Sequence, residues 1–249
     1  MDHRNFQNPH AEAADVISNG YGDLWLLHLS DSALPIGSTA HSFGLEAMVE
    51  SGQLVVDELE DFLADYLSET GFLDAVFCAA AHDLSKLDGA SFSDEWITLG
   101  AKASAFRPSR ECRVASATLG RRFLSLVMEM TQSSQIENVL AISRSAPIEI
   151  HHCTAFGLAC GLLNIGKQAS VRGYLHQLAA SMISSCQRLM PVGQVLASKI
   201  LWNLKKQIVA ISESCVPQGL ENIELAAFSV SVDMAAMRHP NLRTRLFIS

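Results

Sequence analysis

Helical periodicity runs through almost the whole chain from residue 23 onward, and this feature most limits the fold. After a capping-box pattern at Asp57–Glu60, apolar residues recur at helical spacing, at positions 62, 63, 66, 67, 73, 76 and 77. We find no convincing strand with two-residue alternation and no repeat of 20–50 residues. With 49% hydrophobic residues in 249, the chain can build a sizeable core. The sequence predicts an all-α, single globular domain of about nine or ten helices.

Proline and glycine residues indicate where the helices begin and end. Gly71 is expected to bend or divide a long helix, and Pro108 suits the first turn of a helix that reaches about Met130. Further helices are expected over residues 151–163, 171–189, 194–212 and 223–238. We divide the chain into a flexible N-terminal segment (1–22), an all-α domain (23–239) and a C-terminal tail (240–249), and expect both end segments to be ordered mainly by partners.

Composition excludes several functional classes. The net charge of −8 argues against nucleic-acid partners and against an anionic membrane surface. The N-terminus lacks the pattern of a signal peptide, and the longest nearly apolar run, Cys153–Ile165, is short of the roughly 20 residues of a membrane span. Six cysteines without a CxxC pair are typical of reduced thiols. We expect a cytoplasmic protein.

The tail has an unusual composition. Arg243, Arg245, Leu246 and Phe247 follow the helix breaker Pro240. Exposed Leu and Phe side chains forgo about 1.5–3 kcal/mol each of burial free energy. The tail is therefore expected to dock, either on its own protein or on a partner; the rest of the sequence favours a partner.

Catalytic and metal-binding patterns are missing from the sequence. No P-loop, GxGxxG, HExxH, GxSxG or EF-hand pattern occurs. His151 and His152 are adjacent, so on a helix they point about 100° apart, whereas Cys78 and His82 share a helix face but supply only two ligands. We interpret all four as structural residues and predict no catalytic residue and no metal site. A stripe of Arg110, Arg113 and Arg121 is interpreted as solvated or intramolecular.

Two glycine-containing turns and one small-residue pair complete the motifs. Asp31, Pro35 and Gly37 form one turn, and Arg188-Leu-Met-Pro-Val-Gly-Gln194 forms another. Gly157 and Gly161 have GxxxG spacing, which lets a second backbone approach closely. That backbone belongs either to the same chain, the commoner case, or to a two-fold related copy.

In this order, the motifs resemble the UreF family of urease accessory proteins over residues 23–249. The matching segments are Leu26-Leu-His-Leu-Ser-Asp-Ser-Ala-Leu-Pro-Ile-Gly37, His41-Ser-Phe-Gly-Leu-Glu46, Pro108-Ser-Arg-Glu-Cys-Arg113 with Ala115-Ser116 and Gly120-Arg121, His151-His152 with Phe156-Gly157, Arg188–Gln194 and Thr244–Ser249. The resemblance implies an all-α homodimer that matures urease without being an enzyme.

The resemblance also implies partners and site residues. Such proteins bridge a UreD-type (also called UreH) protein and the GTPase UreG, and the complex delivers nickel, its cargo, to apo-urease. We expect no tightly bound cofactor. By resemblance, the expected UreD/UreH contacts are Arg243, Arg245, Leu246, Phe247 and Ser249. A dimer or GTPase-facing corner would contain Arg188, Pro191, Gly193, Gln194, His151 and His152. The signature loop would use Asp31, Pro35, Gly37, His41 and Glu46, and the dimer would pack through Gly157 and Gly161.

Two departures and one alternative remain. The family commonly has Gly-Phe where this chain has Ser38-Thr39, and a basic residue is frequent where it has Ile248. The alternative function is a helical metal-binding protein or direct nickel carrier that uses His151, His152, Cys78 and His82. A DNA-binding regulator is disfavoured by the acidic charge.

Overall fold

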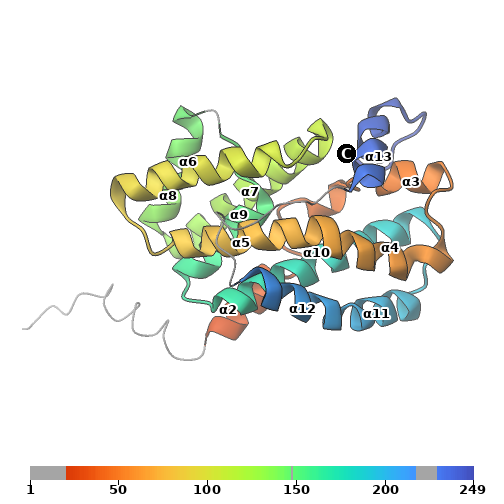
Figure 1. Ribbon diagram of the computed structural model, residues 1–249, viewed down its shortest axis with the longest axis horizontal. Helices are drawn as coiled ribbons and strands as arrows, with labels where there is room; N and C mark the ends of the chain where they lie inside the picture. The colour runs from red at the N-terminus through yellow and green to blue at the C-terminus, as the bar shows by residue number, and fades with distance from the viewer. Residues whose placement is uncertain (1–20, 147, 217–228) are drawn as a thin grey trace, which may run out of the picture.

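The computed structural model describes residues 21–146, 148–216 and 229–249, and all regular structure in these ranges is helical (Figure 1). The all-α prediction is therefore confirmed. The α-helices are α2 (Gly22–Leu29), α3 (Leu45–Glu50), α4 (Leu59–Tyr66), α5 (Phe72–Leu84), α6 (Gly89–Ala105), α7 (Arg110–Thr131), α8 (Ser134–Ser145), α9 (His152–Leu162), α10 (Lys167–Leu189), α11 (Gln194–Asn203), α12 (Lys205–Cys215) and α13 (Val230–Arg238). Shorter helical turns are η1 (Ser38–Ala40), η2 (Val56–Glu58), η3 (Leu67–Gly71) and η4 (His239–Asn241).

Helix α9 lies at the centre of the fold. Residues Cys153 to Cys160 are all buried, as expected of a helix that is apolar on every side. It packs against α5, α7 and α10, and Figure 1 shows it between α7 and α10, beside α5. Around this core, α11 and α12 run along one edge of the molecule, and α13 lies against α3 and α7.

The two glycines of α9 face helix α5 of the same chain. A Cβ atom at Gly157 would lie 2.0 Å from the carbonyl oxygen of Cys78, and one at Gly161 would lie 2.7 Å from that of His82. Both glycines are therefore used inside the chain, where they let two backbones approach. The prediction that Gly157 and Gly161 pack a dimer is wrong, because α5 occupies the surface that a second copy would need.

Most predicted boundaries agree with the structure, and the differences have local causes. Gly71 ends a π-helical turn, η3, that joins α4 to α5, so it does interrupt the long helix. The helix expected over 194–212 is two helices that meet at Leu204. The Asp57–Glu60 capping box does not form, since η2 leads into α4 without a side-chain cap. Ser109, after Pro108, caps α7 through the N–H of Cys112.

Some predictions lie outside the described residues. They are the flexible segment up to residue 20 and the start of the helix expected over 223–238, whose described part is α13. None of the helices in the described ranges has the length and apolar character needed to cross a bilayer.

Candidate functional site

The loop between α2 and α3 is shaped by its turn residues. The Asp31 carboxylate accepts the N–H of Ala33 at 2.8 Å, which closes the first turn. Gly37 has a φ of +84°, and a Cβ there would lie 2.5 Å from an Arg122 guanidinium nitrogen. That same nitrogen donates to the carbonyl of Ile36 at 3.3 Å. The positive φ favours glycine here, and the Arg122 side chain would have to shift to admit a Cβ.

The end of this loop and the start of α3 bind the C-terminal tail. The buried carboxylate of Glu46 accepts the backbone N–H groups of Leu246 and Phe247, the latter at 3.2 Å. The Nδ1 atom of His41 lies 2.6 Å from the Ser249 hydroxyl. The N–H of Ile248 donates to the carbonyl of Ala40 at 2.8 Å. The signature-loop and tail residues, predicted separately, therefore form one structure.

The side chains of the tail alternate between burial and exposure. Phe247 and Ser249 are only 4% and 7% exposed, whereas Leu246 and Ile248 are 54% and 70% exposed. Arg243 and Arg245 are also exposed. The tail thus packs on its own protein through Phe247 and Ser249, and it presents Leu246 and Ile248 to the outside.

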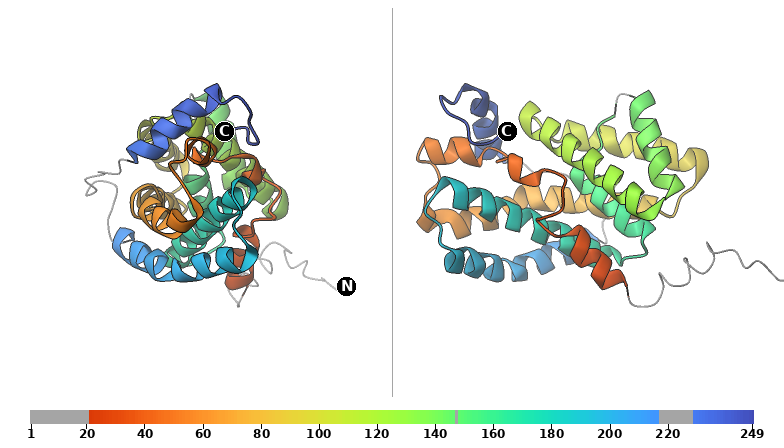
Figure 2. Two further views of the ribbon diagram at one scale, coloured as in Figure 1. Left: turned by 90° about the vertical axis from the view of Figure 1, so that its right-hand side faces the viewer. Right: turned by 180° about the vertical axis from the view of Figure 1, so that it is seen from behind.

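Arg188, in the last turn of α10, joins the turn before α11 to the tail. Its guanidinium lies over the Phe247 ring, 4.2 Å from the ring centroid, and donates to the carbonyl of Thr39. Pro191, Gly193 and Gln194 follow on the surface. We call residues 39–42, Glu46, Arg188 and 246–249 the loop–tail junction; Figure 2 shows the chain end beside α3 and the preceding loop.

A buried histidine holds Glu46 from the opposite side. His239 Nε2 lies 2.8 Å from the Glu46 carboxylate, and Nδ1 lies 3.1 Å from that of Glu111 on α7. The ring is fully buried. The role of His239 could not be predicted from the sequence, because nothing in the local pattern indicates that residues 46, 111 and 239 meet.

His151 and His152 do not belong to the surface corner where the resemblance placed them. His151 is fully buried, and this desolvation, with the charges of Arg107 and Arg113, lowers its pKa to about 2. The His152 ring packs against Phe123 and Tyr174, each 5.5 Å away, and desolvation lowers its pKa to about 4. His151 is a neutral core residue and His152 is neutral, half-buried and packed against the core, which corrects their assignment to a partner-facing corner.

Ser104, His151 and Glu149 come together but lack the geometry of a nucleophilic triad. The Ser104 hydroxyl lies 2.9 Å from His151 Nε2 and donates to Glu149 at 3.0 Å. In a triad the carboxylate orients the base through its other nitrogen. Here His151 Nδ1 has no partner among the described residues, and Glu149 lies on the serine side. Arg113 lies 3.6 Å from the same carboxylate, so its role is intramolecular; Arg110 and Arg121 are exposed.

Cys78 and His82 on α5 are also structural residues. His82 Nε2 lies 2.7 Å from the carbonyl of Ile165, and burial lowers its pKa. Burial also raises the pKa of the Cys78 thiol. Within the described ranges, no three His, Cys, Asp or Glu side chains are grouped so that they could hold a metal ion. The alternative of a direct nickel carrier therefore has no ligand set that can be named there.

A buried polar cluster lines a cavity of about 90 Å³ that is partly open to the surface. Arg107 pairs with Asp74, which also accepts from the Tyr174 hydroxyl at 2.7 Å. The amide of Gln177 lines the same cavity without a partner among the described residues. A space of this size holds several waters, and water satisfies such groups. The cluster contributes to the core, and the loop–tail junction remains the candidate functional site.

The sequence of this chain is similar to those of urease accessory proteins. The UreF family model matches residues 56–205. The urease accessory protein UreF of Bradyrhizobium sp. (strain ORS 278) is 31% identical over 90% of each chain. UreF of Microcystis aeruginosa is 30% identical over 91% of this chain and 97% of its own. UreF of Corynebacterium glutamicum is 29% identical over 91% and 98%. The chain therefore belongs to the UreF family of urease accessory proteins.

Proposed function

We propose that this protein matures urease as a non-enzymatic cytoplasmic scaffold. It links a UreD- or UreH-type protein to a UreG-type GTPase and regulates GTP-dependent nickel insertion into apo-urease. Nickel is the cargo of the complex, and the scaffold itself holds no tightly bound cofactor. The observation that carries the proposal is the ordered tail, which is fixed through its backbone and has Leu246 and Ile248 directed outward.

An ordered tail suits a partner-binding role for an energetic reason. Its backbone is already held by Glu46 and Ala40, so a partner need not supply the free energy that orders these residues. A partner that covers Leu246 and Ile248 would gain part of the burial free energy of each side chain, which is about 1.5–3 kcal/mol for complete burial. We assign these two residues, with Arg243 and Arg245, to the UreD- or UreH-type partner, and Phe247 and Ser249 to anchoring the tail.

The two departures from the family pattern fall in different parts of the junction. Thr39 contributes its carbonyl to Arg188, a contact that does not depend on the side chain. Ile248 is 70% exposed, so the residue type at this position changes the outer surface and leaves the packing intact. The partner of this chain is therefore expected to offer an apolar contact at Ile248.

The turn after Arg188 is assigned to the GTPase. Arg188 contacts Phe247, and exposed Pro191, Gly193 and Gln194 follow it directly. A GTPase bound there would lie close to the tail-bound partner, as a bridging scaffold requires. Binding of one partner would then affect binding of the other through Arg188.

The scaffold is proposed to be a homodimer, and its contact must lie elsewhere than at Gly157 and Gly161. Helix α2 offers a surface, because Leu24 and Leu27 are 61% and 69% exposed and lie on one helix face. A two-fold contact between such helices would bury both copies of the pair. Substituting Leu27→Arg should convert the dimer to a monomer in analytical ultracentrifugation.

The decisive experiment is co-expression with a UreD-type partner. Full-length protein is compared with a chain truncated after Asn241 and with the double variant Leu246→Ser/Ile248→Ser. Val114→Ser is the control, because Val114 is an apolar residue on α7 that is 50% exposed. The proposal predicts that only full length and the control capture the partner. Capture by the truncated chain would show that the tail serves the fold alone.

A second measurement tests the proposal that the protein is not itself an enzyme. Purified protein, free of contaminating GTPase, should hydrolyse no GTP by itself, but should alter hydrolysis by the UreG-type protein in the complex. Intrinsic hydrolysis at a rate that survives further purification would contradict this part.

A further inference from the structure

An exposed aromatic and basic surface lies on α11 and α12. We call it the Trp202 face; its residues are Val195, Lys199, Trp202, Lys205, Lys206 and Val209. Trp202 is 70% exposed and Val195 is 72% exposed, and the Lys205 ammonium lies 3.9 Å from the centroid of the Trp202 ring. The function proposed above uses none of these residues.

Helical spacing gathers these residues around Trp202. Lys199, Lys205 and Lys206 are three or four positions away, and Val195 and Val209 are seven away, so all lie on the Trp202 side. The junction at Leu204 keeps helical backbone angles, with φ −65° and ψ −15°; its N–H donates to the carbonyl of Ile200 and its carbonyl accepts the N–H of Ile208, both at 3.0 Å. In Figure 1, α11 and α12 run together along one edge of the molecule.

The charge of this face contrasts with that of the chain. The net charge is −8, yet three of the six lysines lie within residues 199–206. Among the described residues, none of the three is paired with a carboxylate. An exposed tryptophan beside unpaired cations is a combination found at the centre of protein interfaces, where tryptophan residues contribute strongly to affinity.

Acidic neighbours limit what can bind. Helix α4 runs beside α11, where Asn203 donates to the Glu60 carboxylate at 3.0 Å, and α4 also carries Asp61 and Asp65. Glu213, which lies 3.6 Å from Arg172, borders the far end of the face. An extended anionic surface, such as a bilayer or a nucleic acid, would meet these carboxylates as well as the lysines. A narrow acidic ligand avoids them.

We propose that the Trp202 face binds an acidic segment of a protein partner in urease maturation. One apolar side chain of that segment covers the Trp202 indole, and its carboxylates pair with Lys199, Lys205 and Lys206. That the partner is a urease-maturation protein rests on the proposed function. That the bound segment is acidic, with one apolar side chain, follows from the residues of the Trp202 face.

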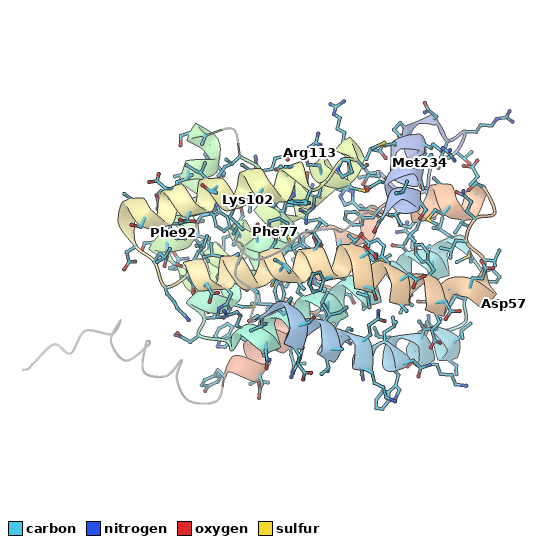
Figure 3. All side chains as sticks on the ribbon, in the orientation of Figure 1. Asp57, Phe77, Phe92, Lys102, Arg113 and Met234 are labelled. Atoms are coloured by element: carbon cyan, nitrogen blue, oxygen red, sulfur yellow. The ribbon has the colours of Figure 1, made fainter. Side chains whose placement is uncertain are left out.

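The test uses purified full-length protein with a UreD-type protein, a UreG-type GTPase and apo-urease, each titrated separately and in the assembled complex. The variants are Trp202→Ala and Lys205→Glu/Lys206→Glu. The matched control is Lys102→Glu, a charge reversal on α6, which lies on the other side of the molecule from α11 and α12 (Figures 1 and 3).

The expected result is a loss of about tenfold or more in affinity for one partner with both variants, and no loss with the control. Iodide quenching of Trp202 should fall in the complex, because Trp96 is buried and Trp202 is the most exposed of the three tryptophans. Carbodiimide should link Lys199, Lys205 or Lys206 to partner carboxylates.

Three results would overturn the inference. The first is that the variants bind every partner as the wild type does. The second is that the wild type binds phosphatidylserine vesicles through this face. The third is that the variants change self-association alone. Assembly of the wild type distinguishes this inference from the proposed function. If the wild type assembles and both variants assemble equally well, the binding role of the Trp202 face is refuted and the proposed function stands. If the wild type assembles with none of the three proteins, the proposed function fails.

Discussion

The carboxylate of Glu46 accepts the backbone N–H of Phe247 at 3.2 Å, although the two residues are 201 positions apart in the sequence. The same buried group accepts from Leu246 and lies 2.8 Å from His239 Nε2. One side chain therefore holds α3, η4 and the tail together. This arrangement explains how a tail with two exposed apolar residues stays ordered without a partner.

Replacing Glu46 should release the tail. In Glu46→Ala, two backbone N–H groups and His239 lose a charged acceptor, and we expect the free energy of unfolding to fall by about 1.5–3 kcal/mol. Carboxypeptidase should also digest residues 246–249 faster. Glu50→Ala, at the exposed end of the same helix, is the control. Equal digestion rates for Glu46→Ala and wild type would contradict this role.

Gly157 should tolerate no side chain. In Gly157→Ala, the new Cβ would lie 2.0 Å from the Cys78 carbonyl, so α5 and α9 must separate. The expected loss is about 3 kcal/mol, at the upper end of what overpacking usually costs. Gly166→Ala is the control, since no atom lies within 4 Å of its Cβ position. Urea unfolding of both variants checks the prediction; a stable Gly157→Ala chain that only loses its dimer would restore the dimer interpretation.

The buried ion pair should matter far more than an exposed one. Asp74→Ala leaves Arg107 buried without its counter-ion, which typically costs about 3–5 kcal/mol. Asp83→Ala removes the pair with Lys167, in which the Asp83 side chain is 48% exposed, and should cost less than about 1 kcal/mol. Thermal unfolding followed by circular dichroism compares the two. Similar losses for both variants would mean that water already screens Asp74.

Stability should decrease below about pH 6.5, the ordinary pKa of histidine. The pKa of His151 is lowered to about 2 and that of His152 to about 4, so between pH 6.5 and 4 the unfolded chain binds more protons than the folded one. The contribution of each group is complete above pH 6.5 and falls by about 1.4 kcal/mol per pH unit toward its folded pKa.

A variant isolates this effect from other groups. The pKa values of His41, His82 and His176 are also lowered by burial, so they add to the total slope. His152→Phe keeps an aromatic ring in the cluster with Phe123 and Tyr174 and removes one titration. Urea unfolding between pH 7 and pH 5 should show a shallower decline for this variant. An unchanged decline would exclude His152 as a source of the acid sensitivity.

The helical class and most boundaries could be predicted because they depend on local sequence. Apolar spacing, Pro108 and Gly71 act within a few residues, so their effects are visible in one segment. The GxxxG spacing of Gly157 and Gly161 correctly indicated close backbone contact. It could not say whose backbone, because α5 lies more than seventy residues earlier in the chain.

The candidate site was harder to predict because it joins distant segments. The composition around Leu246 and Phe247 indicated docking, but its partner Glu46 carries no local sign of burial. His151 and His152 show the opposite problem: their residue types suggest chemistry, and only the packing around them reveals that both are neutral side chains held against the core. The residues around Trp202 can be read from the sequence. Their exposure cannot, because it depends on which face of α11 and α12 packs against the core.

Because a ribosome makes the chain from its N-terminus, Glu46 is synthesised about two hundred residues before Leu246 and Phe247. Until those residues emerge, its carboxylate lacks two of its donors, and Arg188 has no Phe247 ring to cover. The nascent protein can complete its helical core, but not the junction. A chain whose tail is unfinished, or has been trimmed by a protease, would thus leave this buried carboxylate without the two backbone N–H groups that it accepts from the tail.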